Sequence, residues 1–286
     1  MNRSITGFLG GLIFLGLFVG TAQATVVDSL RVELASSRTD TQRMRLHFAL
    51  MSAQTYAAAD TLVAACQAAR SVAMRLGQSK DIGRTWYLEG WALNRKGSFA
   101  ASIQASEQAG HFFAEAGELK QQTKAMVNLS NSYRQMGNPH KAKEMLEGML
   151  EKVEKEKDTL LVATVRNNIA ILHAQEGEFA LAATYFASCL NDFQQVGDSL
   201  EVANAANNLG NVNLKLRNYT QAVDWYIRAA RIDEELKNFR GLAGDYNNIS
   251  HIYLEIGDPK QALTYSNSSF AAYQQIGNVR GMVMSL

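Results

Sequence analysis

Apolar residues recur at helical spacing through most of the chain, in stripes separated by short polar junctions. The stretch that begins at Gly197 shows the pattern clearly, because apolar or small residues fall three or four positions apart from Leu200 to Leu216. A polar turn follows, and a second stripe runs from Ala222 to Leu236. Spacing of this kind is typical of an amphipathic helix, so the stretch is predicted to form two consecutive helices.

The helix pair repeats with a constant period of 40 residues. Each unit has a glycine or arginine at the turn between its helices, a small residue five positions later, and another small residue seven positions before the turn. The turn residues are Gly97, Gly137, Gly177, Arg217 and Gly257. The small residues five positions later are Ser102, Ala142, Ala182, Ala222 and Ala262. The small residues seven positions before the turn are Gly90, Ser130, Ala170, Gly210 and Ser250. A period of this length predicts an all-α solenoid in which each unit packs only on its neighbours. We assign five such repeats to residues 77–276.

The junctions between units carry their own helix-end chemistry. Glycines such as Gly77, Gly117 and Gly197 suit a left-handed residue at the end of a helix. An Asp or Asn after the junction, as at Asp198 or Asn238, can cap the next helix. The junctions therefore predict where each helix pair ends and the next begins.

The N-terminal 76 residues differ from the repeats. Residues 1–24 combine the positive Arg3, a short apolar run and the sequence Ala22-Gln23-Ala24, which is the pattern of a secretory signal peptide cleaved near Ala24. An uncleaved membrane anchor is the alternative, but the apolar run is about 14 residues long and a bilayer span needs roughly 20. Residues 25–76 are predicted to form an N-terminal cap helix and a degenerate leading repeat.

At the other end, residues 277–286 are predicted to be the first helix of an incomplete sixth repeat. An open solenoid end exposes apolar surface. We therefore expect the chain to be a fragment of a longer protein and to self-associate through the uncapped C-terminal end. The alternative is that residues 276–286 act as a short terminal cap.

Paired helices with small residues at fixed offsets resemble the tetratricopeptide repeat (TPR). In that family a small residue of the first helix precedes an aromatic by three positions, and an alanine of the second helix precedes an aromatic by four. The matching pairs here are Ser130 with Tyr133, Ser250 with Tyr253, Ala182 with Phe186, and Ala222 with Tyr226. The resemblance covers residues 77–286 and implies an all-α, right-handed superhelical solenoid of antiparallel helix pairs. The first unit departs from it, because Glu89 stands where a core leucine is expected.

The long period and the recurring sequence Asn-Asn-Ile/Leu-small are similar to a narrower group, the exported repeat regions of bacterial, often Bacteroidetes, signalling proteins. In that group the solenoid precedes a membrane helix and then a histidine kinase or helix-turn-helix output domain. The resemblance implies a periplasmic or extracytoplasmic sensor or adaptor that binds a protein or peptide. A free-standing periplasmic or secreted scaffold for envelope assemblies is the alternative.

A ladder of asparagines is the strongest candidate for a binding site. The TPR resemblance implies that the first helix of each pair lines the concave groove. The amide side chain offers a donor and an acceptor together, which matches the backbone of an extended peptide. The alternative is that the asparagines make interhelical hydrogen bonds that fix repeat stacking, since asparagine is unfavourable inside helices and its recurrence needs a reason. The predicted groove residues are Asn128, Asn168, Asn208, Asn248, Asn167, Asn207, Asn247, Asn131, Asn211 and His251.

Two further sets of side chains leave alternatives open. Basic residues in the first two units either hold a peptide carboxylate or are scattered solvated charges; they are Arg84, Arg95, Lys124 and Arg134. Tyr185, Trp225 and Tyr265 share one position of the second helix, where packing is the more common role of an aromatic and a ligand cage the rarer one.

Charge and composition limit the classes of molecule that the chain is expected to bind. The chain has 28 basic and 27 acidic residues, and loss of Arg3 with the signal peptide leaves them equal. A neutral chain without a basic stripe argues against nucleic acid as a partner. Cys66 and Cys189 lie in distant repeats and are expected to be free, buried thiols.

Chemistry-bearing motifs are missing from the sequence. None of the five histidines has partners at metal-ligand spacing, and there is no phosphate-binding glycine loop or nucleophile elbow. The predicted protein is therefore a non-catalytic binding module without a metal or cofactor.

Overall fold

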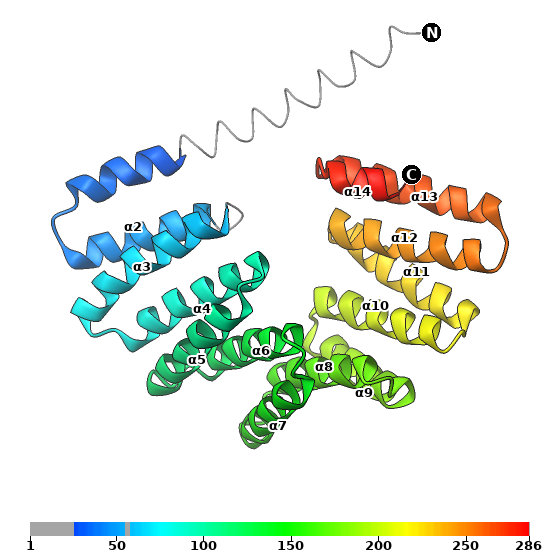
Figure 1. Ribbon diagram of the computed structural model, residues 1–286, viewed down its shortest axis with the longest axis horizontal. Coiled ribbons are helices and arrows are strands. Elements are labelled where there is room, and N and C mark those ends of the chain that lie inside the picture. The colour runs from blue at the N-terminus through cyan, green and yellow to red at the C-terminus, as the bar shows by residue number, and fades with distance from the viewer. Residues whose placement is uncertain (1–25, 55–57, 286) are drawn as a thin grey trace, which may run out of the picture. The chain divides into compact units, whose positions relative to one another are not determined.

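The protein is described by a computed structural model that covers residues 26–54 and 58–285. Helices follow one another through short turns, and no strand occurs in these two ranges (Figure 1). Residues 26–36 are helical. The later helices are α2 (Asp40–Ala53), α3 (Ala59–Leu76), α4 (Ser79–Lys96), α5 (Phe99–Glu115), α6 (Leu119–Gln135), α7 (Pro139–Lys155), α8 (Thr159–Gln175), α9 (Phe179–Val196), α10 (Ser199–Lys215), α11 (Tyr219–Glu235), α12 (Phe239–Glu255), α13 (Pro259–Gln275) and α14 (Val279–Met284).

From α4 onward the helices form consecutive pairs. We call the first helix of each pair the A helix (α4, α6, α8, α10, α12) and the second the B helix (α5, α7, α9, α11, α13). Each is 17 or 18 residues long. A TPR unit of the usual 34 residues has room only for shorter helices, so the longer period lengthens both helices of each pair.

Helix ends follow the junction chemistry. Gly77 and Gly197 adopt a left-handed φ of 63° and 75°, as predicted for helix C-termini. Lys157, Arg217 and Lys237 take the same conformation without being glycine. The side chains of Asp158, Asp198, Asn238, Asp258 and Asn278 each accept a hydrogen bond from a backbone N–H of the following helix.

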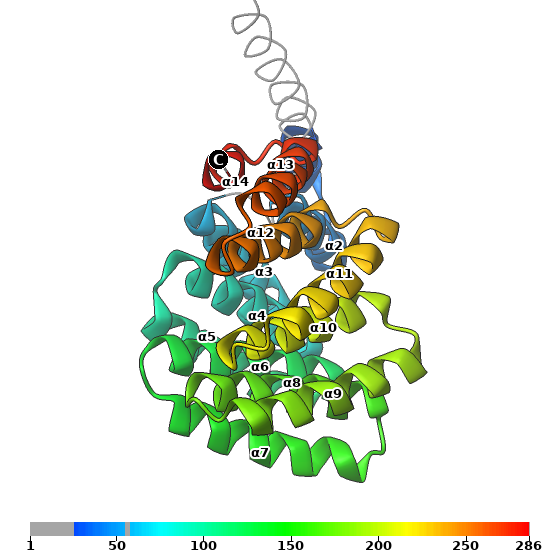
Figure 2. The same ribbon diagram turned by 90° about the vertical axis from the view of Figure 1, so that its right-hand side faces the viewer.

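The chain divides into two compact units, one up to Met149 and one from Leu150, and each has its own core. In the first unit the core between α2, α3 and α4 contains Met51, Leu62 and Cys66. In the second unit the core around α9 and α10 contains Phe186 and Phe193. Figure 2 shows the helices α9 to α13 of the second unit layered in chain order.

Small residues allow the helices of a pair to cross closely. At Gly210 an added Cβ would lie 2.7 Å from the ring of the fully buried Tyr226, so only glycine fits against this aromatic. At other crossings a serine hydroxyl bonds the facing backbone: Ser102 Oγ donates to Gly90 O at 2.7 Å, and Ser250 Oγ donates to Ala262 O at 2.8 Å. These are the small positions that the repeat pattern identified.

Glu89 departs from the leucine pattern because it pairs with a buried arginine. Its carboxylate accepts a hydrogen bond from Arg70 of α3, and both side chains are 9% exposed. Arg70 also donates to Thr85 Oγ1 at 3.3 Å, and its guanidinium carbon lies 3.2 Å from the centroid of the Trp86 ring. The first repeat therefore replaces an apolar contact with a buried ion pair.

The predicted signal peptide, residues 1–24, lies outside the described residues. None of the helices in the described part of the chain is long and apolar enough to cross a membrane. Cys66 and Cys189 are both free and buried.

Candidate functional site

The structure places the asparagine ladder on four A helices. In the first unit α6 carries Asn128 and Asn131; in the second unit α8 carries Asn167 and Asn168, α10 carries Asn207, Asn208 and Asn211, and α12 carries Asn247, Asn248 and His251. Asn128 is buried, whereas Asn211 and His251 are exposed and the others are half-buried. The ladder therefore lies at the boundary between core and solvent.

Five ladder side chains hydrogen-bond to another helix: Asn128, Asn207 and Asn208 as donors, and Asn167 and Asn211 as acceptors. Asn128 Nδ2 donates to Ser106 Oγ of α5 at 2.7 Å. Asn208 Nδ2 donates to Asn167 Oδ1 of α8 at 3.4 Å, and Asn207 Nδ2 donates to Asp245 Oδ1 of α12 at 2.5 Å. These are interhelical contacts of the kind that the stacking alternative predicts.

The remaining members of the ladder make no hydrogen bond to another of the described helices. Asn168 Nδ2 bonds only within its own helix, to Thr164 O at 2.9 Å. Asn131 Oδ1 accepts from Arg134 Nη2 at 3.4 Å. Among the described residues, the side chains of Asn247, Asn248 and His251 have no hydrogen-bond partner. The α12 end of the ladder is therefore the end with most free hydrogen-bonding capacity.

Even the engaged amides keep capacity for a ligand. An asparagine side chain has two N–H donors and an oxygen with two lone pairs. Asn168 and Asn208 each use one donor, so a second donor and the oxygen remain on both. Stacking and ligand contact are thus compatible roles for the same side chain.

Asp245 is a buried residue beneath these asparagines that the sequence pattern does not single out. It is 1% exposed, and its carboxylate accepts the last hydrogen bond in a series that links four polar side chains. Tyr226 OH donates to Asn211 Oδ1 at 2.9 Å, Asn211 Nδ2 donates to Asn207 Oδ1 at 2.9 Å, and Asn207 donates to Asp245. The available sequence signal was the repeat position of Asp245, where the other units have Thr85, Ala125, Val165 and Ala205.

The aromatic position of the B helices is largely used for packing. Tyr185 stacks on His173 with ring centroids 5.5 Å apart, and Tyr265 stacks on Tyr253 at 5.6 Å. Trp225 instead lines an open hollow of about 440 Å³ on α11, and the Arg228 guanidinium lies 5.3 Å from its ring centroid. These aromatics do not form a cage, because each has a different neighbour.

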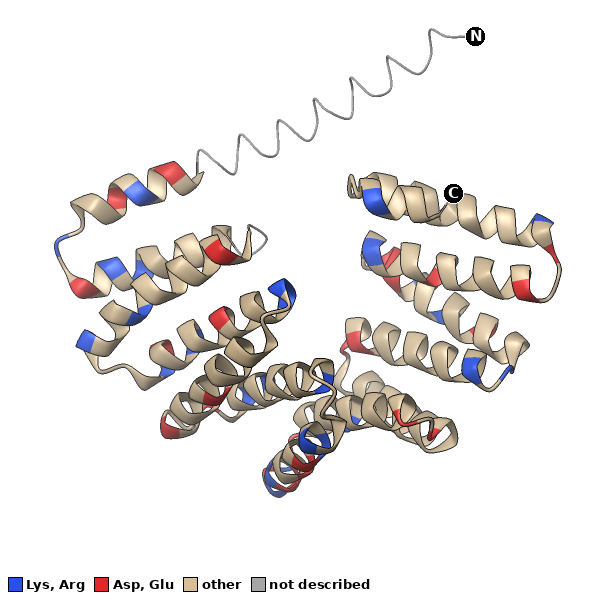
Figure 3. Cartoon of the chain, in the orientation of Figure 1, with Lys and Arg blue, Asp and Glu red and all other residues tan. Residues whose placement is uncertain are grey.

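Three of the four basic residues of the first two repeats contact different neighbours at separate places, and the fourth, Lys124, is exposed. The Arg84 guanidinium lies 4.1 Å from the Phe48 ring centroid, and that of Arg95 lies 4.7 Å from the Trp91 centroid. Burial lowers the pKa of Arg134, which donates to Asn131. Figure 3 shows basic and acidic residues interspersed along the drawn helices. This pattern corresponds to the scattered-charge alternative.

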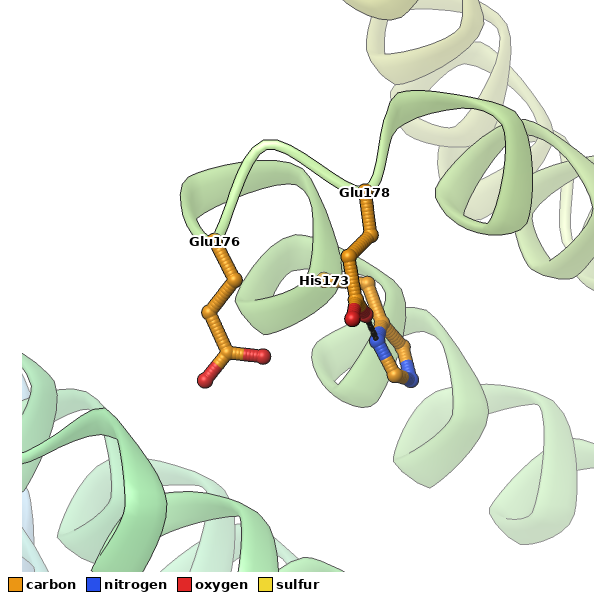
Figure 4. A group of neighbouring side chains, drawn as sticks. All are labelled: His173, Glu176 and Glu178. Carbon is orange, nitrogen blue, oxygen red and sulfur yellow. Dashed lines mark hydrogen bonds and ion pairs between the residues drawn. The ribbon is translucent and has the colours of Figure 1, made fainter.

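One histidine has acidic neighbours that the sequence spacing did not reveal. His173, Glu176 and Glu178 meet at the turn between α8 and α9, with one ligand atom from each within 4.8 Å of the others (Figure 4). The sequence spacing around His173 did not indicate these neighbours, because they meet where the chain turns from one helix to the next. These atoms could hold a divalent cation, but the pair His173–Glu178 also has a structural counterpart in the next repeat. There Asn218 Nδ2 donates to Asn213 Oδ1 at 3.4 Å, five positions apart as in the His–Glu pair.

Comparison with known proteins gives the class. A family model described as tetratricopeptide repeat matches residues 121–195 and 201–275, together more than half of the chain. The chain belongs to the tetratricopeptide repeat family, which confirms the resemblance seen in the sequence and the all-α repeat fold. A search of curated proteins found no match.

Several solved structures share the fold. BtubC (BKLC) from P. vanneervenii superposes with a TM-score of 0.65 and 20% identity, over 77% of this chain and 92% of that chain. A Rap protein complexed with competence and sporulation factor superposes with a TM-score of 0.65 and 11% identity, over 91% of this chain and 76% of that chain. The apo form of the quorum sensor NprR from B. thuringiensis superposes with a TM-score of 0.62 and 13% identity, over 98% of this chain and 80% of that chain.

Proposed function

We propose that this chain is a non-catalytic TPR scaffold that binds an extended peptide or protein segment on the asparagine-bearing face of its A helices. The observation that carries the proposal is the ladder on α8, α10 and α12, with half-buried or exposed amides on three successive A helices of one compact unit. In the first unit, α6 carries two further predicted groove residues, Asn128 and Asn131. The Rap protein solved with competence and sporulation factor and the quorum sensor NprR share the fold and support this class of ligand.

The ladder sets a minimum length for the ligand. Packed helices lie about 8–10 Å apart, and an extended chain advances about 3.3 Å per residue, so neighbouring rungs contact positions about three residues apart. A peptide that contacts all three A helices therefore needs about seven residues. Recognition through backbone groups would tolerate many sequences, with side chains of the ligand adding preference.

Fluorescence polarisation of the purified full chain with a library of random octapeptides tests the proposal. The double variant Asn168→Ala/Asn208→Ala should lose at least tenfold in affinity while its far-UV circular dichroism and melting temperature stay close to the parent. Asn204→Ala is the matched control, because Asn204 is an exposed asparagine of α10 outside the ladder. Tetrapeptides and backbone N-methylated octapeptides should bind weakly or not at all. Unchanged affinity in the double variant would refute the ladder as the binding site, and a large fall in melting temperature would assign it to stacking.

We further propose that the chain is the exported sensor or adaptor region of a bacterial signalling protein, periplasmic after cleavage near Ala24. The signal-like pattern of residues 1–24 and the narrower resemblance of the repeats support this role. N-terminal sequencing of the expressed protein should find Thr25 as the first residue. The gene beyond codon 286 should encode a membrane segment and an output domain; a capping helix and a stop codon there would instead make the chain a free-standing scaffold.

A further inference from the structure

Two acidic residues occupy core positions where the last two complete repeats meet. Asp245 of α12 is 1% exposed, and Asp233 of α11 is 5% exposed. The other repeats have apolar, small or aromatic residues at the position of Asp233, namely Phe113, Val153, Phe193 and Tyr273. Burial of two carboxyl groups in one repeat contact is unfavourable unless they are hydrogen-bonded or neutral.

Only one of the two carboxyl groups is well accommodated. Asp233 Oδ1 accepts a hydrogen bond from Asn238 Nδ2 at 2.9 Å. Space for Asp233 depends on Gly241, where an added Cβ would lie 1.9 Å from Asp233 Oδ2. Asp245 Oδ1 accepts from Asn207, but Asp245 Oδ2 is buried without a hydrogen-bond partner among the described residues. A buried oxygen of this kind disfavours the ionised carboxylate far more than the neutral acid.

The elements packed around Asp245 contribute no compensating cation among the groups found to act on it. From α10 it receives the Asn207 amide, and from α11 it faces the charge of Asp233. Its own charge acts on Tyr226 of α11 and Tyr246 of α12, and contributes to raising the pKa of both phenols. From α13, Ser269 Oγ donates to Ala243 O, two residues away, and so does not serve the carboxyl. Burial first, and the Asp233 charge in addition, raise the pKa of Asp245 to about 7, although the Asn207 hydrogen bond lowers it in part.

The Asp245 carboxyl also orients part of the ladder. The hydrogen bonds run in one direction, from Tyr226 through Asn211 and Asn207 to Asp245. Asn207 is half-buried and Asn211 is exposed, so the chain of bonds leads from the core to the surface. The orientation of two ladder amides therefore depends on the acceptor at its buried end.

We propose that Asp245 is a proton switch in the contact of α12 with α10 and α11. With the proton on its buried carboxyl, the contact is closed and the amides of Asn207 and Asn211 are held in place. Loss of the proton puts an uncompensated charge into the core, which loosens the contact and changes the hydrogen bond that orients the two amides. The switch stands without any ligand; its consequence for peptide binding rests on the proposed function.

Denaturation with urea at several pH values tests the linkage to folding. Because the folded protein holds this proton more tightly than the unfolded chain, its stabilising effect is complete at acidic pH and is lost as pH rises to about 7. The unfolding equilibrium constant of the parent, divided by that of Asp245→Ala, should rise about tenfold per pH unit between about 5 and 7 and level off above that. Alanine should be tolerated, because Ala125 and Ala205 occupy the same position in other repeats. Asp224→Asn, at an exposed aspartate of α11, is the matched control and should keep the parental pH dependence.

NMR of the full chain labelled with [¹⁵N]asparagine gives a second readout that a merely structural role would not move. The side-chain amide resonances of Asn207 and Asn211 should shift with a midpoint near neutral pH in the parent and stay constant in Asp245→Asn. Static resonances between pH 5 and 9, or an Asp245→Ala variant with the parental pH dependence, would overturn the switch. Both experiments are done without peptide, so a failure to find a peptide ligand would count against the proposed function and not against the switch.

Discussion

Replacement of the buried ion pair between α3 and α4 gives the sharpest test of how the first repeat is stabilised. Glu89 occupies the position of Leu129, Ile169, Leu209 and Ile249, and Arg70 occupies that of Gly110, Leu150, Leu190, Ala230 and Phe270. We therefore choose Glu89→Leu, Arg70→Leu and the double variant, because leucine occurs at both positions in other repeats. Removal of one partner leaves a buried charge without compensation and typically costs about 3–5 kcal/mol.

The structure predicts an order between the two single variants. In Glu89→Leu the cation keeps the Thr85 hydroxyl and the Trp86 ring as partners, so we expect a loss near 3 kcal/mol. Burial lowers the pKa of Arg70 to about 10, so the side chain stays charged at pH 7 in spite of the loss. In Arg70→Leu the carboxylate keeps only Gln67, whose Nε2 donates to Glu89 at 3.5 Å, and the stack on Trp86, worth about 2 kcal/mol when desolvated, is lost as well. The expected cost is about 4–5 kcal/mol.

The double variant should recover most of this loss and lie within about 1 kcal/mol of the parent, because an apolar pair avoids the desolvation of both charges. The assay is urea denaturation followed by far-UV circular dichroism, analysed as a double-mutant cycle with an expected coupling of at least about 3 kcal/mol. Arg70→Leu should also regain stability at acidic pH, because the buried Glu89 carboxylate can then be protonated. Protonation of a glutamate costs about 1.4 kcal/mol for each pH unit above its ordinary pKa of about 4.3.

Lys80→Gln supplies the control for this cycle. Lys80 Nζ lies 2.5 Å from Glu118 Oε1, but the lysine side chain is 63% exposed, so the change should cost less than about 1 kcal/mol. A Glu89→Leu variant as stable as the parent would refute the reasoning. A double variant no more stable than the worse single variant would do the same.

Two further predictions follow from close contacts and burial. Gly210→Ala should lower the free energy of unfolding by about 1–3 kcal/mol, because the added Cβ would clash with the Tyr226 ring. Gly244→Ala should raise it by about 0.5–1 kcal/mol, because a Cβ at this position inside α12 meets nothing within 4 Å. Equal effects of the two variants in urea denaturation would contradict the contact argument. Burial raises the pKa of the Cys66 and Cys189 thiols to about 12. A thiol reagent at pH 8 should therefore label neither cysteine in the native protein and both in urea. Rapid labelling of the native protein would show that the repeats open locally.

Helix positions and repeat boundaries were predictable because they depend on local chemistry. The 3/4 spacing of apolar residues predicts helices at 200–216 and 222–236, and the structure has α10 at Ser199–Lys215 and α11 at Tyr219–Glu235. The junction at Gly197 adopts the left-handed conformation that its glycine allows. Period, turn and cap are properties of neighbouring residues, and they can be read without knowledge of distant contacts.

The partners of polar side chains were not predictable in the same way. Glu89 departs from the leucine pattern, and only the structure shows that Arg70, 19 positions earlier, compensates it. Asp245 occupies a position that other repeats fill with small or apolar residues, yet its bond to Asn207 spans 38 positions. His173 has its acidic neighbours in a turn, where the end of one helix returns toward the start of the next.

The sequence by itself therefore determined the class of fold, the repeat period, the helix ends and the set of asparagines on the A helices. The tertiary structure decided which of those asparagines are used between helices, which keep free hydrogen-bonding capacity, and which acidic residues are buried. The physical reason is that amphipathic periodicity is a local property repeated along the chain. Desolvation and hydrogen-bond satisfaction, in contrast, depend on residues that come together only when the repeats pack.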